Sequence, residues 1–323
     1  MSSRERRLAV AEPGGAPFRR ADGTPWGSGL IRSLKRRPTR PVHDLWPSLI
    51  DAIAVGCLLM LIITGAILAI FYTPSSTLVR YHGSYPLLRG VEMSQAYAST
   101  LAISFDLSGG LLLRQTHHWA ALILPAALML RLLLAFFTGA FRTPRRPQWL
   151  LSVAAFLTAL LGGWSGYALP DDLLAGTGLR IFQGVLLGIP VIGTWLSLVL
   201  FGGEYPGDVL ARIYPIHLAA PVVLVALLVA RARLARRGRP DQGDNASPRN
   251  GQPGRVVGWS TRTVEWLGMV VITSGVLITF GGLVEISPVW RQGPSTPGAA
   301  GAGSQPDWYT AFLDGALRLV PQG

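Results

Sequence analysis

Two histidines at matching positions in two apolar stretches are the residues of this chain best suited to chemistry. His117 lies near the start of a stretch that contains Arg131, and His217 lies near the start of another that contains Arg231. In both stretches 14 residues separate the histidine from the arginine. Ionisable groups inside a membrane are costly, so each one is a candidate functional residue. The repeated pattern indicates two helices that face a shared object.

A b-type haem is one object that two such histidines could share. Neutral imidazoles at the same depth on adjacent helices can be the two axial ligands of a haem iron. His118 points about 100° away from His117 around the helix, so only one of the two can face a given haem. The alternative is a pair of interfacial histidines that bond to the backbone or to lipid headgroups.

Arginines and glycines near the histidines favour the haem interpretation. Arg114 and Arg212 precede the two histidines by three and five residues, and their guanidinium groups could pair with the haem propionates. A small residue lets a porphyrin approach a helix backbone closely. Gly65 and Gly166 lie at the matching depth in two other apolar stretches. We therefore expect His117 and His217 to be the iron ligands.

The composition is that of a membrane protein. Of the 323 residues, 50% are hydrophobic, and the mean hydropathy is +0.38. The net charge of +12 does not indicate a nucleic-acid partner, because the basic residues gather between the apolar stretches. The single cysteine, Cys57, lies inside an apolar stretch, which excludes a disulfide framework, a cysteine metal site and a covalently attached c-type haem.

Five apolar stretches are long enough to cross a bilayer as helices. The expected spans are 48–72, 115–137, 149–169, 213–232 and 266–284. The fold class that follows is an all-α membrane protein, with a four-helix haem-binding transmembrane bundle plus a fifth transmembrane helix. The segments 73–113 and 170–210 are expected to be extramembrane loops.

These spans divide the chain into four parts. Residues 1–47 are basic and rich in Pro and Gly, which predicts a disordered cytoplasmic arm. The four-helix haem bundle covers 48–232, and a polar cytoplasmic linker covers 233–256. The fifth helix and an outer tail cover 257–323.

The basic residues also predict the orientation in the cell membrane. Lys and Arg are concentrated in the arm, in the loop after the second span and in the linker. By the positive-inside rule, this predicts a multi-pass protein with a cytoplasmic N-terminus. His117 and His217 then lie near the outer ends of their spans, and Arg131 and Arg231 near the inner ends.

Several longer motifs identify a family. They occupy 88–94, 114–119, 137–141, 166–172, 189–194 and 212–217, and 304–309 is similar to a Pro-Glu-Trp-Tyr quinol-site motif. Through these motifs the chain, over roughly 42–323, resembles the cytochrome b subunit of quinol:cytochrome c oxidoreductases in its actinobacterial form. The family has further spans after the quinol-site motif, so we expect the outer quinol pocket to be incomplete within this polypeptide.

The resemblance implies one haem site and departs from the family at a second. The family holds an outer and an inner b haem, each between a histidine of the second span and one of the fourth. The outer positions match here, but the inner histidines are replaced by Arg131 and by Arg231 or Ala232, and the inner glycines by Asp51 and Ser152. We expect one haem b, at the outer site. We also expect Asp51 to pair with the arginines in the vacated volume, although the arginines could instead extend to the inner headgroups.

The resemblance also implies a function and partners. By that likeness the chain is a subunit of a respiratory quinol:cytochrome c reductase, with quinol, membrane lipid, a Rieske iron–sulfur protein and a cytochrome c subunit as partners, within a dimer or larger complex. Asp307 would accept a quinol proton with Tyr309 nearby, and a partly dry pocket would raise the pKa of that carboxyl. The alternatives are a single-haem electron carrier and a non-redox paralogue without a Q cycle.

Overall fold

The structure is a computed structural model that describes residues 46–203, 207–237, 261–296, 298, 307–311 and 315. The predicted arm over 1–47 lies almost wholly outside the described residues. The same holds for most of the linker over 233–256 and for the first residues of the quinol-site-like motif.

Within the described residues, five helices are long and apolar enough to cross a membrane. They are α2 (Trp46–Phe71), α4 (Gly110–Phe137), α5 (Arg146–Ala168), α8 (Val209–Arg237) and α9 (Thr261–Leu283). The predicted number and order of spans are confirmed. The helices begin and end a few residues away from the predicted bounds, most of all α8 and α9, because a helix can continue beyond the apolar segment that hydropathy detects.

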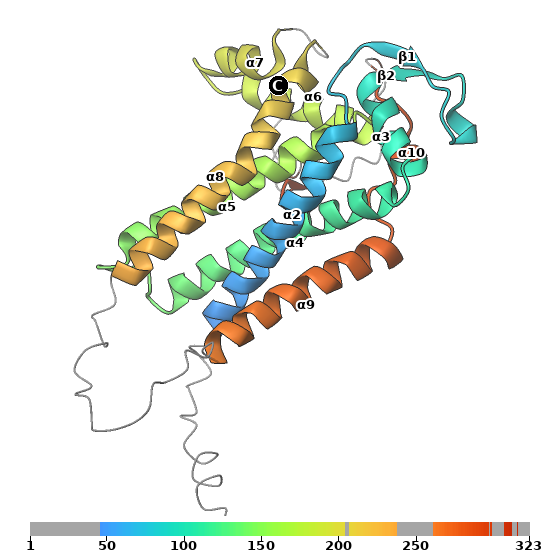
Figure 1. The fold of residues 1–323 in the computed structure, drawn as a ribbon. Coiled ribbons are helices and arrows are strands. Elements are labelled where there is room, and N and C mark those ends of the chain that lie inside the picture. Colours follow the sequence, from blue (N-terminus) through green and yellow to red (C-terminus); the bar gives the residue numbers. More distant parts are fainter. Residues whose placement is uncertain are drawn as a thin grey trace, which may run out of the picture. The chain divides into compact units, whose positions relative to one another are not determined.

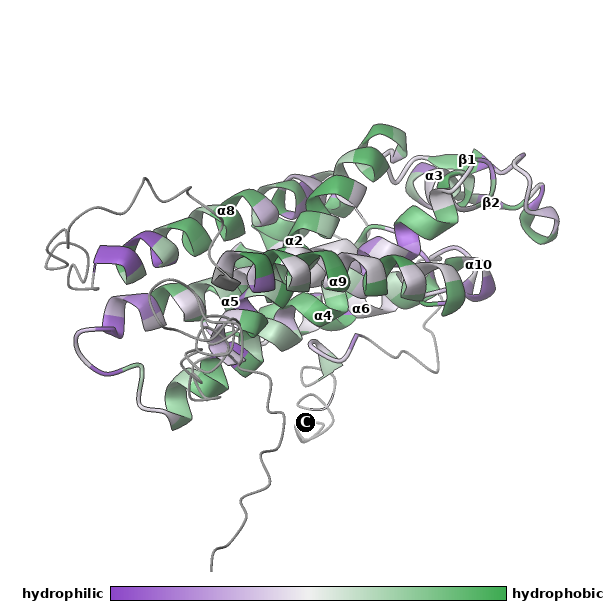
Figure 2. Ribbon diagram, turned by 60° about the horizontal axis from the view of Figure 1, so that its bottom comes forward, coloured by the Kyte–Doolittle hydropathy of each residue, from purple (hydrophilic) through white to green (hydrophobic). Residues whose placement is uncertain are grey.

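The five helices pack as a four-helix bundle with one helix on its side. α2 packs against α4 and α5 against α8, while α9 lies along α2 and α4 (Figure 1). α4 also contacts α5, which joins the two pairs. Figure 2 shows hydrophobic colour along the lengths of these helices and hydrophilic colour at the arginine-rich end of α8. The predicted fold class is therefore confirmed.

The two segments predicted as loops contain regular structure. The first holds the antiparallel strands β1 (Leu78–Arg80) and β2 (Glu92–Ser94), a short 3-10 helix, η2 (Pro86–Leu88), and α3 (Gln95–Phe105). The second holds α6 (Leu173–Leu187) and α7 (Gly193–Phe201). The side chain of Ser94 caps α3 and that of Asp172 caps α6, each by accepting a backbone N–H bond. Both connecting segments therefore contain helices, and the first also strands, that the sequence analysis did not predict.

A segment after α9, residues 287–295, crosses the end of the bundle that carries the histidines, and we call it the strap. It contains α10 (Val289–Gln292). The Tyr97 hydroxyl donates to the Val289 carbonyl at 3.0 Å, across 192 residues of sequence. The Leu173 N–H donates to the Gly293 carbonyl at 3.0 Å. The strap thus ties the end of α9 to α3 and to the start of α6.

Candidate functional site

A cavity of about 540 Å³ lies between the four helices of the bundle. Each helix contributes one of the predicted histidines or glycines to its lining: Gly65 from α2, His117 from α4, Gly166 from α5 and His217 from α8. The volume is within the range that cofactor pockets usually have. The structure therefore brings together four residues that the sequence spreads over more than 150 positions.

The two imidazoles are spaced to hold a single metal ion. Their ring centroids lie 6.1 Å apart, with an angle of 62° between the ring planes. With about 2 Å for each metal–nitrogen bond and about 1 Å from the nitrogen to the ring centre, two imidazoles on opposite sides of one metal have centroids about 6 Å apart. The spacing of His117 and His217 fits the axial pair of one haem iron.

Hydrogen bonds assign the same tautomer to both histidines. His217 Nδ1 lies 3.0 Å from the Gly162 carbonyl oxygen, to which it can only donate. His117 Nδ1 lies 2.9 Å from Thr64 Oγ1, whose own hydroxyl donates to the Met60 carbonyl at 2.6 Å. Nδ1 is therefore the protonated nitrogen in each ring, and the lone pair lies on Nε2. Such bonds orient metal-ligating histidines and raise their basicity.

Gly65 and Gly166 lie directly against the two imidazoles. A Cβ on Gly65 would come 3.0 Å from His117 Cε1, and a Cβ on Gly166 would come 2.7 Å from His217 Cε1. Any side chain at Gly166 would therefore displace the histidine. The sequence analysis expected these glycines to let a porphyrin approach the helix backbone. In the structure they also let the two histidine rings pack against the backbones of α2 and α5.

The two arginines predicted to meet propionates have different positions. Arg114 lines the cavity and donates through Nη2 to the Ser287 carbonyl at 2.9 Å, and its buried Nε has no hydrogen-bond partner among the described residues. That donor suits an anionic group in the cavity. Arg212 is exposed, donates to the Val199 carbonyl at 3.0 Å and is not among the described residues that line the cavity.

Helix geometry accounts for this difference. Arg114 is three residues from His117, which places it about 60° away on the same side of α4. Arg212 is five residues from His217, which places it about 140° away on the opposite side of α8. The structure thus supports only Arg114 as a neighbour of a propionate.

The predicted quinol-site residues also reach the cavity. Asp307 and Tyr309 both line it, and Tyr309 is 3% exposed. The Tyr309 hydroxyl donates to Asp307 Oδ2 at 2.7 Å. His118 Nε2 lies 3.1 Å from Asp307 Oδ1. The carboxylate is therefore held from both sides, with a tyrosine and a histidine as its partners.

The prediction that the pKa of Asp307 is raised was wrong, because these contacts lower it. Burial alone would raise the pKa of this carboxyl, but the hydrogen bond and charge of His118 and the bond from Tyr309 together hold it below its ordinary value. Asp307 is therefore ionised at neutral pH.

Sequence reasoning missed His118 and Tyr167. The 100° rotation that turns His118 away from the haem position turns it toward Asp307, 189 residues later in the chain. No local pattern indicates that pairing. Tyr167 lines the cavity, and its buried hydroxyl has no hydrogen-bond partner among the described residues. Its only signal was its place beside Gly166 in one of the motifs.

The predicted pairing of Asp51 with the inner arginines is confirmed. Arg231 donates through Nη1 and Nη2 to the two carboxylate oxygens of Asp51 at 3.0 and 3.1 Å. Arg131 Nε lies 3.3 Å from Asp51 Oδ1. Both arginines therefore lie at the carboxylate, which favours pairing over the alternative that they extend to the headgroups.

Comparison with known proteins identifies the family. A family model described as cytochrome b (N-terminal)/b6/petB matches residues 122–294. The cytochrome bc1 complex cytochrome b subunit of Streptomyces coelicolor is 40% identical over 306 residues, which cover 92% of this chain and 55% of that protein. The subunit of the same name from Mycobacterium leprae is 42% identical over 295 residues, covering 90% and 53%. The chain spans about half of the length of these curated relatives.

A solved structure shares the fold. It is described as a hyperthermophilic respiratory Complex III, with a TM-score of 0.63 and 22% identity over 85% of this chain and 70% of that one. The overall fold is thus one already seen in a solved structure. With the family model, the two relatives and the paired histidines, it follows that this chain belongs to the cytochrome b family.

Proposed function

We propose that the chain is a cytochrome b-type subunit of a membrane quinol:cytochrome c oxidoreductase and that it binds one b haem between His117 and His217. The observation that carries the proposal is the pair of imidazoles, 6.1 Å apart, with both Nδ1 protons committed to helix groups. Two neutral imidazoles with free Nε2 lone pairs are a donor set for haem iron.

The bound haem would supply one-electron transfer, and the protein's own residues would hold and insulate it. Gly65 and Gly166 leave room for the ligating rings, and Arg114 would bind a propionate through its buried Nε, which has no partner in the part of the chain that the structure describes. The apolar walls of the cavity would exclude water from the iron. A low local dielectric strengthens every charge interaction inside.

Quinol is the proposed electron donor, at the side of the cavity formed by Asp307, Tyr309 and His118. The ionised Asp307 carboxylate would accept the proton of a quinol hydroxyl. Tyr309 and His118 would keep the carboxylate in place, since each bonds a different one of its oxygens. A Rieske iron–sulfur protein, a cytochrome c subunit and membrane lipid are the partners that this role requires, within a dimer or larger complex.

The proposed orientation places the N-terminus in the cytoplasm and the cavity in the outer half of the membrane. Arg142, Arg145 and Arg146 follow α4 at the end opposite to the histidines, and Arg236 and Arg237 end α8 at the same side. The positive-inside rule assigns that side to the cytoplasm.

A second candidate is a single-haem membrane electron carrier that has no Q cycle, or a paralogue without redox activity. The ion cluster of Asp51, Arg131 and Arg231 at the inner level favours it over a two-haem subunit. A haem in the purified chain would exclude the non-redox alternative.

The test is a reduced-minus-oxidised haem spectrum with an iron-to-protein ratio on the purified chain. His117→Ala and His217→Ala should each abolish the b-type spectrum, whereas His118→Ala, which changes the adjacent residue, should retain it. A normal spectrum in His217→Ala would refute the ligand assignment.

A further inference from the structure

Three helices place charged residues at one level on the far side of the bundle from the histidines. Asp51 lies 14 residues before Gly65, Arg131 lies 14 after His117, and Arg231 lies 14 after His217. At 1.5 Å per residue, each offset corresponds to about 21 Å along its helix. The chain direction of α2 is antiparallel to that of α4 and α8, so an offset of 14 residues backward in α2 and forward in α4 and α8 leads to the same depth.

These residues form one ion cluster, which we call the inner triad. Arg231 binds both oxygens of Asp51, at 3.0 and 3.1 Å. Arg131 Nε is 3.3 Å from Asp51 Oδ1, which is an ion-pair distance. The side chains of Asp51, Arg131 and Arg231 are 33%, 22% and 17% exposed. One carboxylate therefore neutralises one of two partly buried guanidinium groups and lies beside the other.

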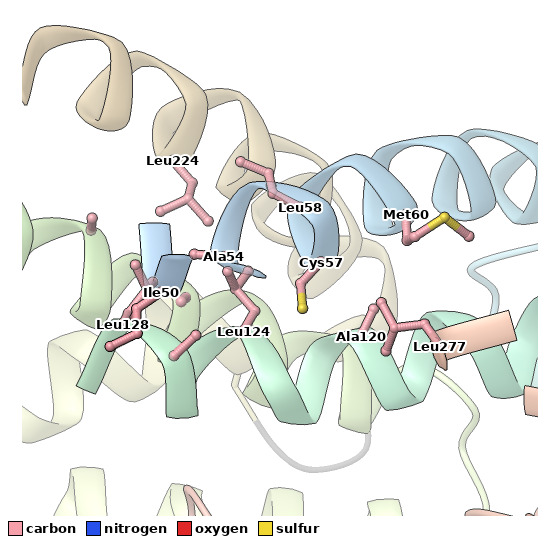
Figure 3. Close-up of a cluster of buried hydrophobic side chains, with 13 residues drawn as sticks. Ile50, Ala54, Cys57, Leu58, Met60, Ala120, Leu124, Leu128, Leu224 and Leu277 are labelled. Carbon is pink, nitrogen blue, oxygen red and sulfur yellow. The ribbon is translucent and has the colours of Figure 1, made fainter. Parts of the chain in front are cut away.

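The space between the triad and the histidines is filled by apolar side chains. Figure 3 shows Cys57, Leu124, Leu128 and Leu224 gathered between the helices, and these four are at most 4% exposed. Leu58, Leu124 and Leu224 also line the histidine cavity, so the packed core forms its floor. Interiors packed in this way have no room for a planar macrocycle unless side chains move out.

The residues at the inner level do not provide iron ligands. Arginine stays protonated and carries no lone pair for a metal. The carboxylate of Asp51 is bound by the guanidinium groups, and the Ser152 hydroxyl donates to the Gln148 carbonyl at 2.8 Å. The inner haem that the cytochrome b family implies therefore does not fit this chain.

We propose that the inner triad is a structural clamp that replaces a second haem, so that any electrons handled by this chain enter and leave at the histidine level. The clamp would hold α2, α4 and α8 together through charge where a shared cofactor would otherwise join the helices. The electron-transfer part rests on the proposed function, whereas the clamp stands on the ion cluster and the packed core alone.

Haem content is the first test. A pyridine haemochrome assay with iron analysis on the full chain should give one haem per polypeptide, and a redox titration should show a single one-electron component. Two haems per chain would overturn the inference. An absence of haem would overturn the proposed function instead, and the stability measurements below would then decide the clamp.

Removing the carboxylate tests the clamp without reference to haem. Asp51→Ala leaves two guanidinium groups side by side in a partly buried place, and Tm should fall on the order of 5 °C. Arg291→Ala is the matched control, because it breaks the exposed Glu285–Arg291 pair, in which the arginine is 63% exposed. That variant should leave Tm nearly unchanged.

A second variant separates the clamp from a general failure to fold. Replacing all three charges with apolar residues (Asp51→Leu, Arg131→Met and Arg231→Met) removes the unpaired charge, and Tm should return to within a few degrees of the parent. Buried ion clusters generally tolerate such replacement better than the loss of one partner. An unchanged Tm in Asp51→Ala would refute the clamp.

Restoring histidines tests whether the packed core excludes the macrocycle. The double variant Arg131→His with Arg231→His should still bind one haem, because Leu124, Leu128 and Leu224 remain in place. A second haem in that double variant would show that the inner level accepts a haem once ligands are present, and would overturn the inference.

Discussion

The contact between Gly166 and His217 makes a graded prediction about haem retention. A Cβ on Gly166 would lie 2.7 Å from His217 Cε1, whereas ordinary contact begins at 3.4 Å. Gly166→Ala must therefore push the imidazole by about 0.7 Å. Such a shift strains the bond between His217 Nδ1 and the Gly162 carbonyl, which is 3.0 Å long.

The expected effect is a loss of about 10–100-fold in haem affinity, the range seen when an orienting partner of a metal ligand is disturbed. Gly65→Ala should have a smaller effect, because its Cβ would lie 3.0 Å from His117 Cε1. Gly275→Ala is the control, since this glycine of α9 has nothing within 4 Å of an added Cβ. Its haem affinity should equal that of the parent.

The assay is titration of haem-depleted protein with haemin, followed by the absorbance of the six-coordinate product. The order of affinities should be parent and Gly275→Ala first, then Gly65→Ala, then Gly166→Ala. If Gly166→Ala bound haem as tightly as Gly275→Ala, the packing of His217 on the α5 backbone would not determine its position, and the reasoning would fail.

Three further outcomes are expected. His118→Ala should raise the pKa of Asp307, measured by the infrared carboxyl band, because the group that most lowers this pKa is lost; an unshifted band would refute the pairing. Burial raises the pKa of Asp171 and Asp172 to about 6, so the folded state binds their protons more tightly, and stability should fall as pH rises from about 4 to 7. The double variant Asp171→Asn with Asp172→Asn, which keeps a capping residue at 172, should lose that part of the pH dependence in thermal unfolding. Finally, a strain whose only cytochrome b is this chain should not sustain quinol:cytochrome c reduction by a Q cycle; robust steady-state activity that Asp307→Ala abolishes would contradict the loss of the inner haem.

The spans and the level of the charged residues were predictable because they follow from hydropathy and from helical rise. Five apolar stretches gave five helices, and equal offsets of 14 residues placed Asp51 beside Arg131 and Arg231. Both patterns depend on the sequence and on the fixed rise per residue of a helix, so they can be predicted without knowledge of the tertiary packing.

The connecting segments and the pairing of His118 were not predictable in the same way. α6 and α7 are short, and such helices depend on tertiary packing and on the cap from Asp172 rather than on their own pattern. The partner of His118 comes from the far end of the chain, which no local spacing reveals. The wrong prediction for Arg212 was avoidable, because its five-residue separation from His217 already places the two side chains about 140° apart around α8.

The strap over 287–295 has a consequence for biogenesis. Arg114 on the cavity wall is held by the Ser287 carbonyl, and Tyr97 is held by Val289, so the histidine end closes only when residues made after α9 have emerged. Contacts of such sequence separation form late in folding. We expect nascent chains stalled before residue 287 to insert α2 to α9 yet release haem readily, and tight retention by those chains would contradict this order. Haem retention would then depend on synthesis of the strap, so the site would close only after residues 287–295 had been made.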